Sequence, residues 1–136
     1  MKILNEQLPM LNEILGAGML PSETTIFTYG DTIYNPGGHE LPDHLIEHEE
    51  THCDQQGNDP KKWWERYLID PYFRIEQESE AYANQFAYIC AKVKDRNKRS
   101  VICSDLARAL SGPLYGSVIS QQNAYNTIKV KSKVRP

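Results

Sequence analysis

The chain has 136 residues, enough for one domain with its own buried core, so we expect a single domain over residues 1–136. No apolar stretch reaches the roughly 18 residues that a membrane span needs, which argues against a membrane partner. The formal net charge is only −3, but residues 1–91 carry −11 and residues 92–136 carry +8.

The expected compartment is the cytoplasm. Asn5, Glu6, Asn12 and Glu13 interrupt the N-terminal segment, where a signal peptide would have an apolar core. The three cysteines lie at unrelated spacings and form no CxxC pair, so they indicate neither a disulfide framework nor a zinc ribbon. They predict free thiols in a reducing compartment.

The first predicted elements are one or two strands within residues 24–34, TTIFTYGDTIY. Their β-branched and aromatic residues surround a Gly-Asp turn signal, and the sequence NPGG at 35–38 ends them. A helix is then expected to begin near Pro42, which suits a first helical position, and to end at Gly57.

Two further helices follow in the middle of the chain. Residues 59–68, DPKKWWERYL, predict a short helix capped by Asp59, with two tryptophans as core anchors. Asp70 and the proline after it repeat the capping pattern and start a long helix that we expect to reach about Arg96.

The last third predicts two more helices, which begin at Ser104 and Ser120 and are separated by the turn-like SGPLYG. A basic tail is expected from about residue 129. The fold class is therefore α+β: mostly helical, with a short hairpin or small sheet before the first long helix.

The basic residues of this last third, in KVKDRNKR (92–99) and in the tail, suggest two interpretations. The first is that they attract nucleic acid or an acidic partner. The second is that the lysines only close a helix, where they complement its C-terminal dipole, and it is favoured because no aromatic residues alternate with them to stack on bases. Nucleic acid is therefore not an expected partner.

The sequence HEETH at 48–52 carries the chemistry. On a helix, His48 and His52 share one face, so both imidazoles can reach one tetrahedral zinc ion. Glu49 then lies beside the ion rather than in its coordination shell, where it can act as general base toward an activated water. The motif alone also arises by chance in a helix rich in His and Glu.

A catalytic zinc site takes three protein ligands, so a third is needed. His44 lies one turn before His48, but ligands at i, i+4 and i+8 would spread over about 12 Å, too far for one ion. The long helix offers Glu76, Glu78 and Glu80. Glu78 borders the apolar stripe of that helix and is our preferred ligand, while the other two remain alternatives.

The two elements together resemble the gluzincins, zinc metallopeptidases with H-E-x-x-H on one helix and a glutamate on a following one. HEETH at 48–52 and ESEAY at 78–82 are similar to the two metal-binding elements of this family. The resemblance implies one zinc ion per chain, with His48, His52 and Glu78 as ligands and Glu49 as base.

The chain looks closest to small, minimal zincin-like proteins of phages and bacteria, which implies host cytoplasm or virion as the location. The resemblance also implies that Ile26–Tyr34 forms an edge strand that pairs with an extended peptide substrate. Tyr82 departs from the family, where an acidic residue supports a ligand. The metzincin pattern is excluded because Gln55 and Asn58 replace its glycine and third histidine.

Two function classes follow. The first is a zinc-dependent metallopeptidase that cleaves peptide or amide bonds, with Tyr115, Tyr125 or neither as the group that stabilises the oxyanion. The second is a zincin-like binding or structural module with little turnover. A retained Glu49 favours the first, because a structural zinc site closed by four ligands needs no base. The substrate and the oligomeric state do not follow from the sequence.

Overall fold

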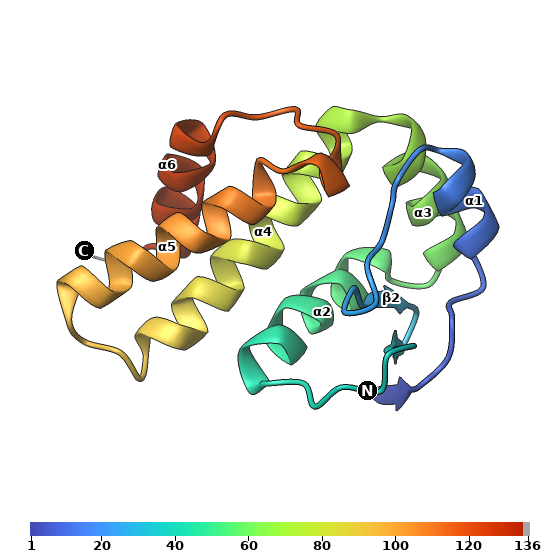
Figure 1. Ribbon diagram of the computed structural model, residues 1–136, viewed down its shortest axis with the longest axis horizontal. Coiled ribbons are helices and arrows are strands. Elements are labelled where there is room, and N and C mark those ends of the chain that lie inside the picture. Colours follow the sequence, from blue (N-terminus) through green and yellow to red (C-terminus); the bar gives the residue numbers. More distant parts are fainter. Residues whose placement is uncertain (135–136) are drawn as a thin grey trace.

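Three short strands form a small mixed sheet in a computed structural model that describes residues 1–134 (Figure 1). Strands β2 (Phe27–Tyr29) and β3 (Thr32–Tyr34) form an antiparallel hairpin around Gly30, whose φ is +62°. Strand β1 (Lys2–Leu4) pairs in parallel with β3, which gives the order β1-β3-β2. The hairpin confirms the prediction, whereas β1 was missed because all three of its residues are exposed.

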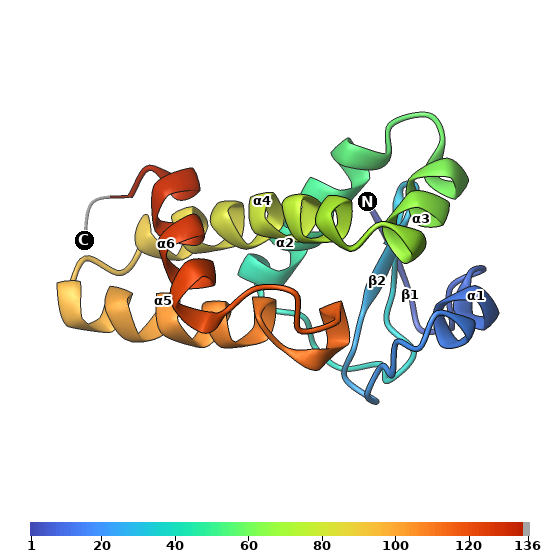
Figure 2. The ribbon, with the colours of Figure 1, turned by 90° about the horizontal axis from the view of Figure 1, so that it is seen from above.

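Helices make up most of the described chain, which confirms the predicted mostly helical α+β class. They are α1 (Leu11–Gly16), α2 (Asp43–Gln56), α3 (Pro60–Ile69), α4 (Pro71–Cys90), α5 (Arg96–Leu110), the short 3-10 helix η1 (Pro113–Tyr115) and α6 (Gln121–Ser132). Helix α4 runs through the middle of the molecule, with α5 and α6 on one side and α2, α3 and the sheet on the other (Figures 1 and 2). Within residues 1–134, no helix is both long and apolar enough to span a bilayer.

The helices that carry the motifs begin and end close to the predicted positions. The α2 helix follows Pro42 and stops at Gly57, whose φ of +56° breaks the helix. The Asp59 carboxylate caps α3, and the Asp70 carboxylate accepts two backbone N–H groups at the start of α4. The side-chain caps therefore fix where α3 and α4 begin.

The prediction was wrong about the turn between α4 and α5. Helix α4 ends at Cys90 rather than near Arg96, and α5 begins at Arg96 rather than at Ser104. The Asp95 side chain caps α5 by accepting a backbone N–H three residues on, at 2.9 Å. The Arg99 guanidinium donates to the Cys90 carbonyl at 2.8 Å. Part of the basic segment thus closes a helix–helix turn.

The chain end also differs from the prediction. Ser120 caps α6 as expected, by accepting the Asn123 N–H at 3.1 Å. Helix α6 continues to Ser132, so the tail predicted from about residue 129 is helical over its first part. Residues 135–136 of that tail lie outside the described residues.

Two hydrophobic clusters form the core. One joins α4, α5, α6 and η1, and the other joins α1, α3 and the sheet and contains the predicted anchors Trp63 and Trp64. Leu114 of η1 packs against both. His48, Glu49, His52 and Glu78 belong to neither cluster, although Tyr67 and Tyr82 of the clusters contact them, so the polar site lies between the two clusters.

Candidate metal centre

Helices α2 and α4 pack side by side and bring the two sequence motifs together. Fully buried Ala81 has only a methyl side chain, which allows close approach, and the Asn84 amide donates to the Thr51 hydroxyl across the contact at 3.0 Å. His48, His52 and Glu78 then place one ligand atom each within 4.8 Å of one another. All three are buried, and together they could hold a metal ion.

Of the three candidate glutamates, the structure brings only Glu78 to the histidines. Its Oε1 lies 3.1 Å from Nε2 of His48 and 3.2 Å from Nε2 of His52. Glu76 and Glu80 are exposed on the outer face of α4. The two-residue steps from Glu78 turn each of them about 200° around the helix, away from the two histidines.

Gln55 fixes the proton position on His52. Its amide N–H groups face two acceptors, the Gln77 carbonyl at 2.9 Å and the Glu80 carboxylate at 3.2 Å. Its Oε1 therefore points to Nδ1 of His52, at 2.8 Å. Because an amide oxygen only accepts, Nδ1 of His52 carries the proton and Nε2 presents a lone pair to the site.

Gln85 has the same role for His48. Its Oε1 lies 2.9 Å from Nδ1 of His48, and its amide nitrogen donates to Nδ1 of His44 at 2.9 Å. His44, excluded as a ligand by the helix geometry, thus lies one hydrogen bond further out and sets which way the Gln85 amide points. This orientation directs the Nδ1–H of His48 to Gln85 and turns Nε2 toward Glu78.

The donor set fits a cation. Two imidazole lone pairs and a carboxylate oxygen converge, an arrangement that repels unless a proton or a metal ion lies between them. Without metal, burial by itself lowers the pKa of His52, but the Glu78 carboxylate outweighs it and raises that pKa to about 9. Burial likewise opposes ionisation of Glu78, yet the histidines keep its pKa below the usual range.

The remaining oxygen of Glu78 is also held. The Tyr67 hydroxyl donates to its Oε2 at 2.6 Å. Tyr67 is 1% exposed and stacks on Trp63, whose ring lies 5.4 Å from that of His52. The carboxylate therefore has a fixed orientation, with Oε1 left for the site.

Glu49 lies beside the three residues but is not one of them. The Thr28 hydroxyl, from β2, donates to its Oε1 at 3.0 Å. Its Oε2 is 3.7 Å from Nε2 of His48. Glu49, the two histidines and Glu78 line one small chamber. Burial raises the pKa of Glu49, partly offset by the two histidines. The carboxylate is thus placed to exchange a proton with a molecule in the chamber.

The chamber itself is small, with a volume of about 40 Å³. Tyr115 borders it, and the Tyr115 and Tyr82 hydroxyls lie 2.9 Å apart. Tyr82 packs its ring against His48 at 4.4 Å, instead of acting as a carboxylate acceptor. Tyr125 lies on α6 and borders a different cavity, so of the two tyrosines considered from sequence only Tyr115 reaches the site.

The expected edge strand is only partly realised. In the stretch Ile26–Tyr34, β3 is the central strand and only β2 is an edge. The outward carbonyl of Thr28 already accepts from Gln56 at 2.8 Å and from Trp64 at 3.0 Å, and the Gly30 N–H donates to Gln56 at 2.7 Å. A peptide strand cannot pair at these positions while these bonds are present.

Comparison of the chain with models of known protein families gives no match, and comparisons with curated proteins and with solved structures give none either. The gluzincin resemblance therefore depends on the two short motifs alone.

Sequence analysis did not identify the residues that orient the site: Thr28, Gln55, Tyr67 and Gln85. The two glutamines had a detectable signal. Gln55 follows His52 by three residues and Gln85 follows Glu78 by seven, spacings that share a helix face. The tyrosine and the threonine come from α3 and β2, and only the tertiary fold places them here.

The ligand set can be tested by zinc content. Glu78→Ala should abolish stoichiometric zinc binding, because it removes the carboxylate oxygen that faces both histidines. Glu76→Ala, an exposed change two residues away, should retain one zinc per chain. Elemental analysis after dialysis measures both. The opposite pattern, with zinc kept in Glu78→Ala and lost in Glu76→Ala or Glu80→Ala, would contradict the assignment.

A double-mutant cycle tests the His44–Gln85 chain. Gln85→Met should weaken zinc binding by about 10- to 100-fold, the usual cost of losing such a partner. His44→Ala should weaken it less, by freeing the amide to flip. In a Gln85→Glu background, adding His44→Ala should not weaken zinc binding further, because a carboxylate has two equivalent oxygens and needs no partner to orient it. Chelator competition gives the affinities.

Metal removal should loosen the protein without unfolding it. Zinc in 100-fold excess over its dissociation constant stabilises a folded chain by about 2.7 kcal/mol, so the melting temperature should fall when a chelator is added. The two hydrophobic clusters exclude the ligands, so circular dichroism should still show a helical protein. An unchanged melting curve after verified zinc removal would show that the site does not stabilise the fold.

Proposed function

We propose that the protein is a zinc-dependent hydrolase that cleaves peptide or amide bonds. The observation that carries the proposal is the position of Glu49, buried beside His48, His52 and Glu78 and held by Thr28 without belonging to the ligand group. Two imidazoles and one carboxylate are a donor set typical of catalytic zinc, which leaves a fourth position open. A closed structural site would give Glu49 no task.

The residues divide the work as follows. Bound zinc would act as a Lewis acid and lower the pKa of water to about 7. Glu49 would take a proton from a water in the chamber through Oε2, the hydroxide would add to the scissile carbonyl carbon, and Glu49 would return the proton to the leaving amine as the C–N bond breaks. Thr28 keeps Oε1 engaged and so keeps the carboxylate turned toward the chamber. The raised pKa of Glu49 brings its proton affinity closer to what such an exchange at neutral pH requires.

The tyrosine pair at the chamber wall is the proposed oxyanion donor. Two hydroxyls carry two protons, and the bond between Tyr82 and Tyr115 uses only one of them. The other remains available to donate toward the reacting carbonyl oxygen. Burial and the nearby Glu78 charge raise the pKa of Tyr115, so it keeps its proton at neutral pH.

The alternative, a zincin-like module with little turnover, is favoured by one observation. The chamber holds only about 40 Å³, and His48, Glu49, His52 and Glu78 are each at most 5% exposed. A site closed this tightly also suits a metal that only stabilises the fold. The two functions differ in what the Glu49 carboxylate does.

Replacing Glu49 separates them. Glu49→Gln keeps the size of the side chain and the acceptor for Thr28, but the amide cannot take a proton from water. Zinc content and melting temperature should stay near wild type, while hydrolysis should fall by a factor of about 10² to 10⁴, the scale of a lost general base. Turnover on a casein and cell-wall peptide panel measures the effect.

Glu50→Gln is the matched control, because Glu50 is the next residue on α2 and is exposed. It should behave as wild type in all three measurements. Equal activity of wild type and Glu49→Gln, or no turnover by either on any peptide, would reject the hydrolase and leave the binding module.

A further inference from the structure

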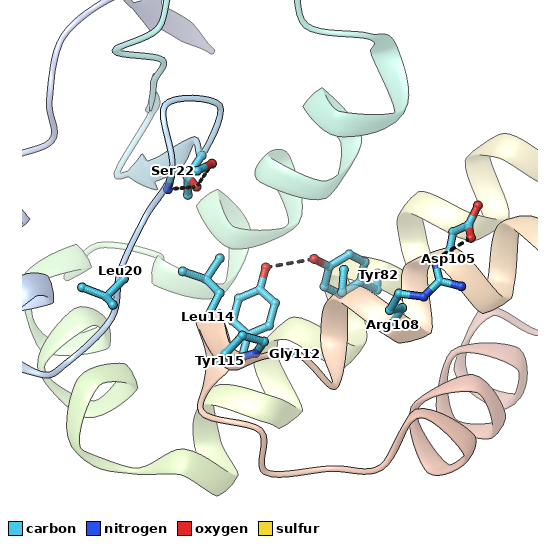
Figure 3. A pocket seen from close by; sticks show the side chains of 11 residues that line it. Leu20, Ser22, Tyr82, Asp105, Arg108, Gly112, Leu114 and Tyr115 are labelled. Atoms are coloured by element: carbon cyan, nitrogen blue, oxygen red, sulfur yellow. Dashed lines mark hydrogen bonds and ion pairs between the residues drawn. The ribbon is translucent and has the colours of Figure 1, made fainter.

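A second, much larger hollow adjoins the metal chamber. It is an open cleft of about 470 Å³ between the segment that precedes β2, the end of α5 and the turn containing η1. Figure 3 shows Leu20 and Ser22 on one side, Arg108 on the other, and the Tyr82–Tyr115 hydroxyl pair between them. Its volume is within the about 300–1,000 Å³ typical of ligand sites.

The cleft and the metal chamber are neighbours with a common wall. Thr25, Leu114 and Tyr115 line both of them. Tyr82 also lines the cleft, and its ring packs against the ligand His48 at 4.4 Å. A molecule lying in the cleft would therefore be close to the residues that hold the metal.

The chamber volume decides which part of a substrate goes where. A chamber of about 40 Å³ holds a few waters or a small group such as a carbonyl, and it is far smaller than the cleft of about 470 Å³. A side chain next to the reacting bond has no room inside it. The cleft is the adjoining space large enough to hold one.

The lining of the cleft indicates the chemistry of that side chain. Most of the surface comes from apolar or aromatic groups, among them Leu20, Ala109 and Leu114. The charged lining residues are Asp105 and Arg108, which pair with each other at 3.2 Å, so the lining has no net formal charge. Such a surface favours an apolar side chain over an ionised one, whose desolvation it would not repay.

Main-chain recognition at β2 is restricted, which adds weight to side-chain recognition. Gln56 and Trp64 occupy the outward carbonyl of Thr28, and Gln56 also occupies the Gly30 N–H. A substrate cannot gain affinity there by adding a strand, so more of its binding free energy must come from groups outside the sheet.

We propose that this cleft binds a bulky apolar side chain, leucine or phenylalanine in size, of an extended peptide whose neighbouring bond lies at the metal centre. The proposal rests on the proposed hydrolase function for the reaction, but the binding itself can be measured without turnover.

The binding test uses zinc-loaded Glu49→Gln protein, so that peptides are held and not consumed. The probes are capped pentapeptides of alanine that differ only at the central residue: Ala, Leu, Phe, Glu or Lys. The Leu and Phe peptides should bind about tenfold or more tighter than the Ala peptide, the ratio expected for burying one such side chain. The Glu and Lys peptides should gain nothing over Ala.

Filling the cleft should remove this preference. Ala109 is exposed on α5 and lines the cleft, so Ala109→Phe occupies the space without disturbing the core. With this change, the Leu and Phe peptides should bind no better than Ala, while zinc content stays at one per chain. The control is Val101→Phe. Val101 is on the same helix, is 62% exposed and does not line the cleft, so this change should keep the full preference.

The outcomes separate this proposal from the hydrolase. An apolar preference that Ala109→Phe abolishes supports the cleft, even if wild type cleaves none of the peptides, in which case only the hydrolase fails. Equal binding of all five peptides, tighter binding of the Glu or Lys peptide, or a preference that survives Ala109→Phe would overturn the cleft proposal. Cleavage of the peptides by wild type would then still support the hydrolase.

Discussion

The structure of the site depends on one buried carboxylate. Glu78 is 4% exposed, and an ionised group at that depth is tolerated only when its charge is compensated. The Tyr67 hydroxyl holds one oxygen, and the other faces two imidazole nitrogens that carry lone pairs. A proton on His52 or a metal ion among these three atoms turns a repulsive arrangement into an attractive one, so the contact between α2 and α4 is built to hold positive charge.

The proposed zinc ion would be compensated in charge by the carboxylates of the site. Glu78 and Glu49 are the two carboxylates of the site, and together they balance a charge of +2. Both histidines are oriented by neutral amides, Gln55 and Gln85, where a carboxylate would add further negative charge to a buried site. Amides fix the tautomer without that cost, which explains how the site can do without an acidic residue at Tyr82.

Much of this could be read from the sequence, because it depends on local rules. Helical spacing placed His48, Glu49 and His52 correctly relative to one another, and the apolar stripe favoured Glu78 over the exposed Glu80. The hairpin and the capped starts of α3 and α4 follow from turn and capping residues. The prediction failed at the 90–96 turn, where the Arg99 guanidinium donates to the Cys90 carbonyl and the capping residue Asp95, a local signal, was overlooked.

What sequence could not supply is the layer around the ligands and the space beyond it. Thr28 and Tyr67 reach the site from β2 and α3, which are distant in sequence and meet only through packing against Trp64 and the sheet. The wall between chamber and cleft has the same origin, since buried Arg74 holds the Tyr115 carbonyl at 3.1 Å and the Tyr67 carbonyl at 2.9 Å. The Arg74 guanidinium thus connects the η1 turn to α3, the helix whose Tyr67 orients Glu78. The position of Tyr115 between the chamber and the cleft and the orientation of the Glu78 carboxylate therefore both depend on Arg74.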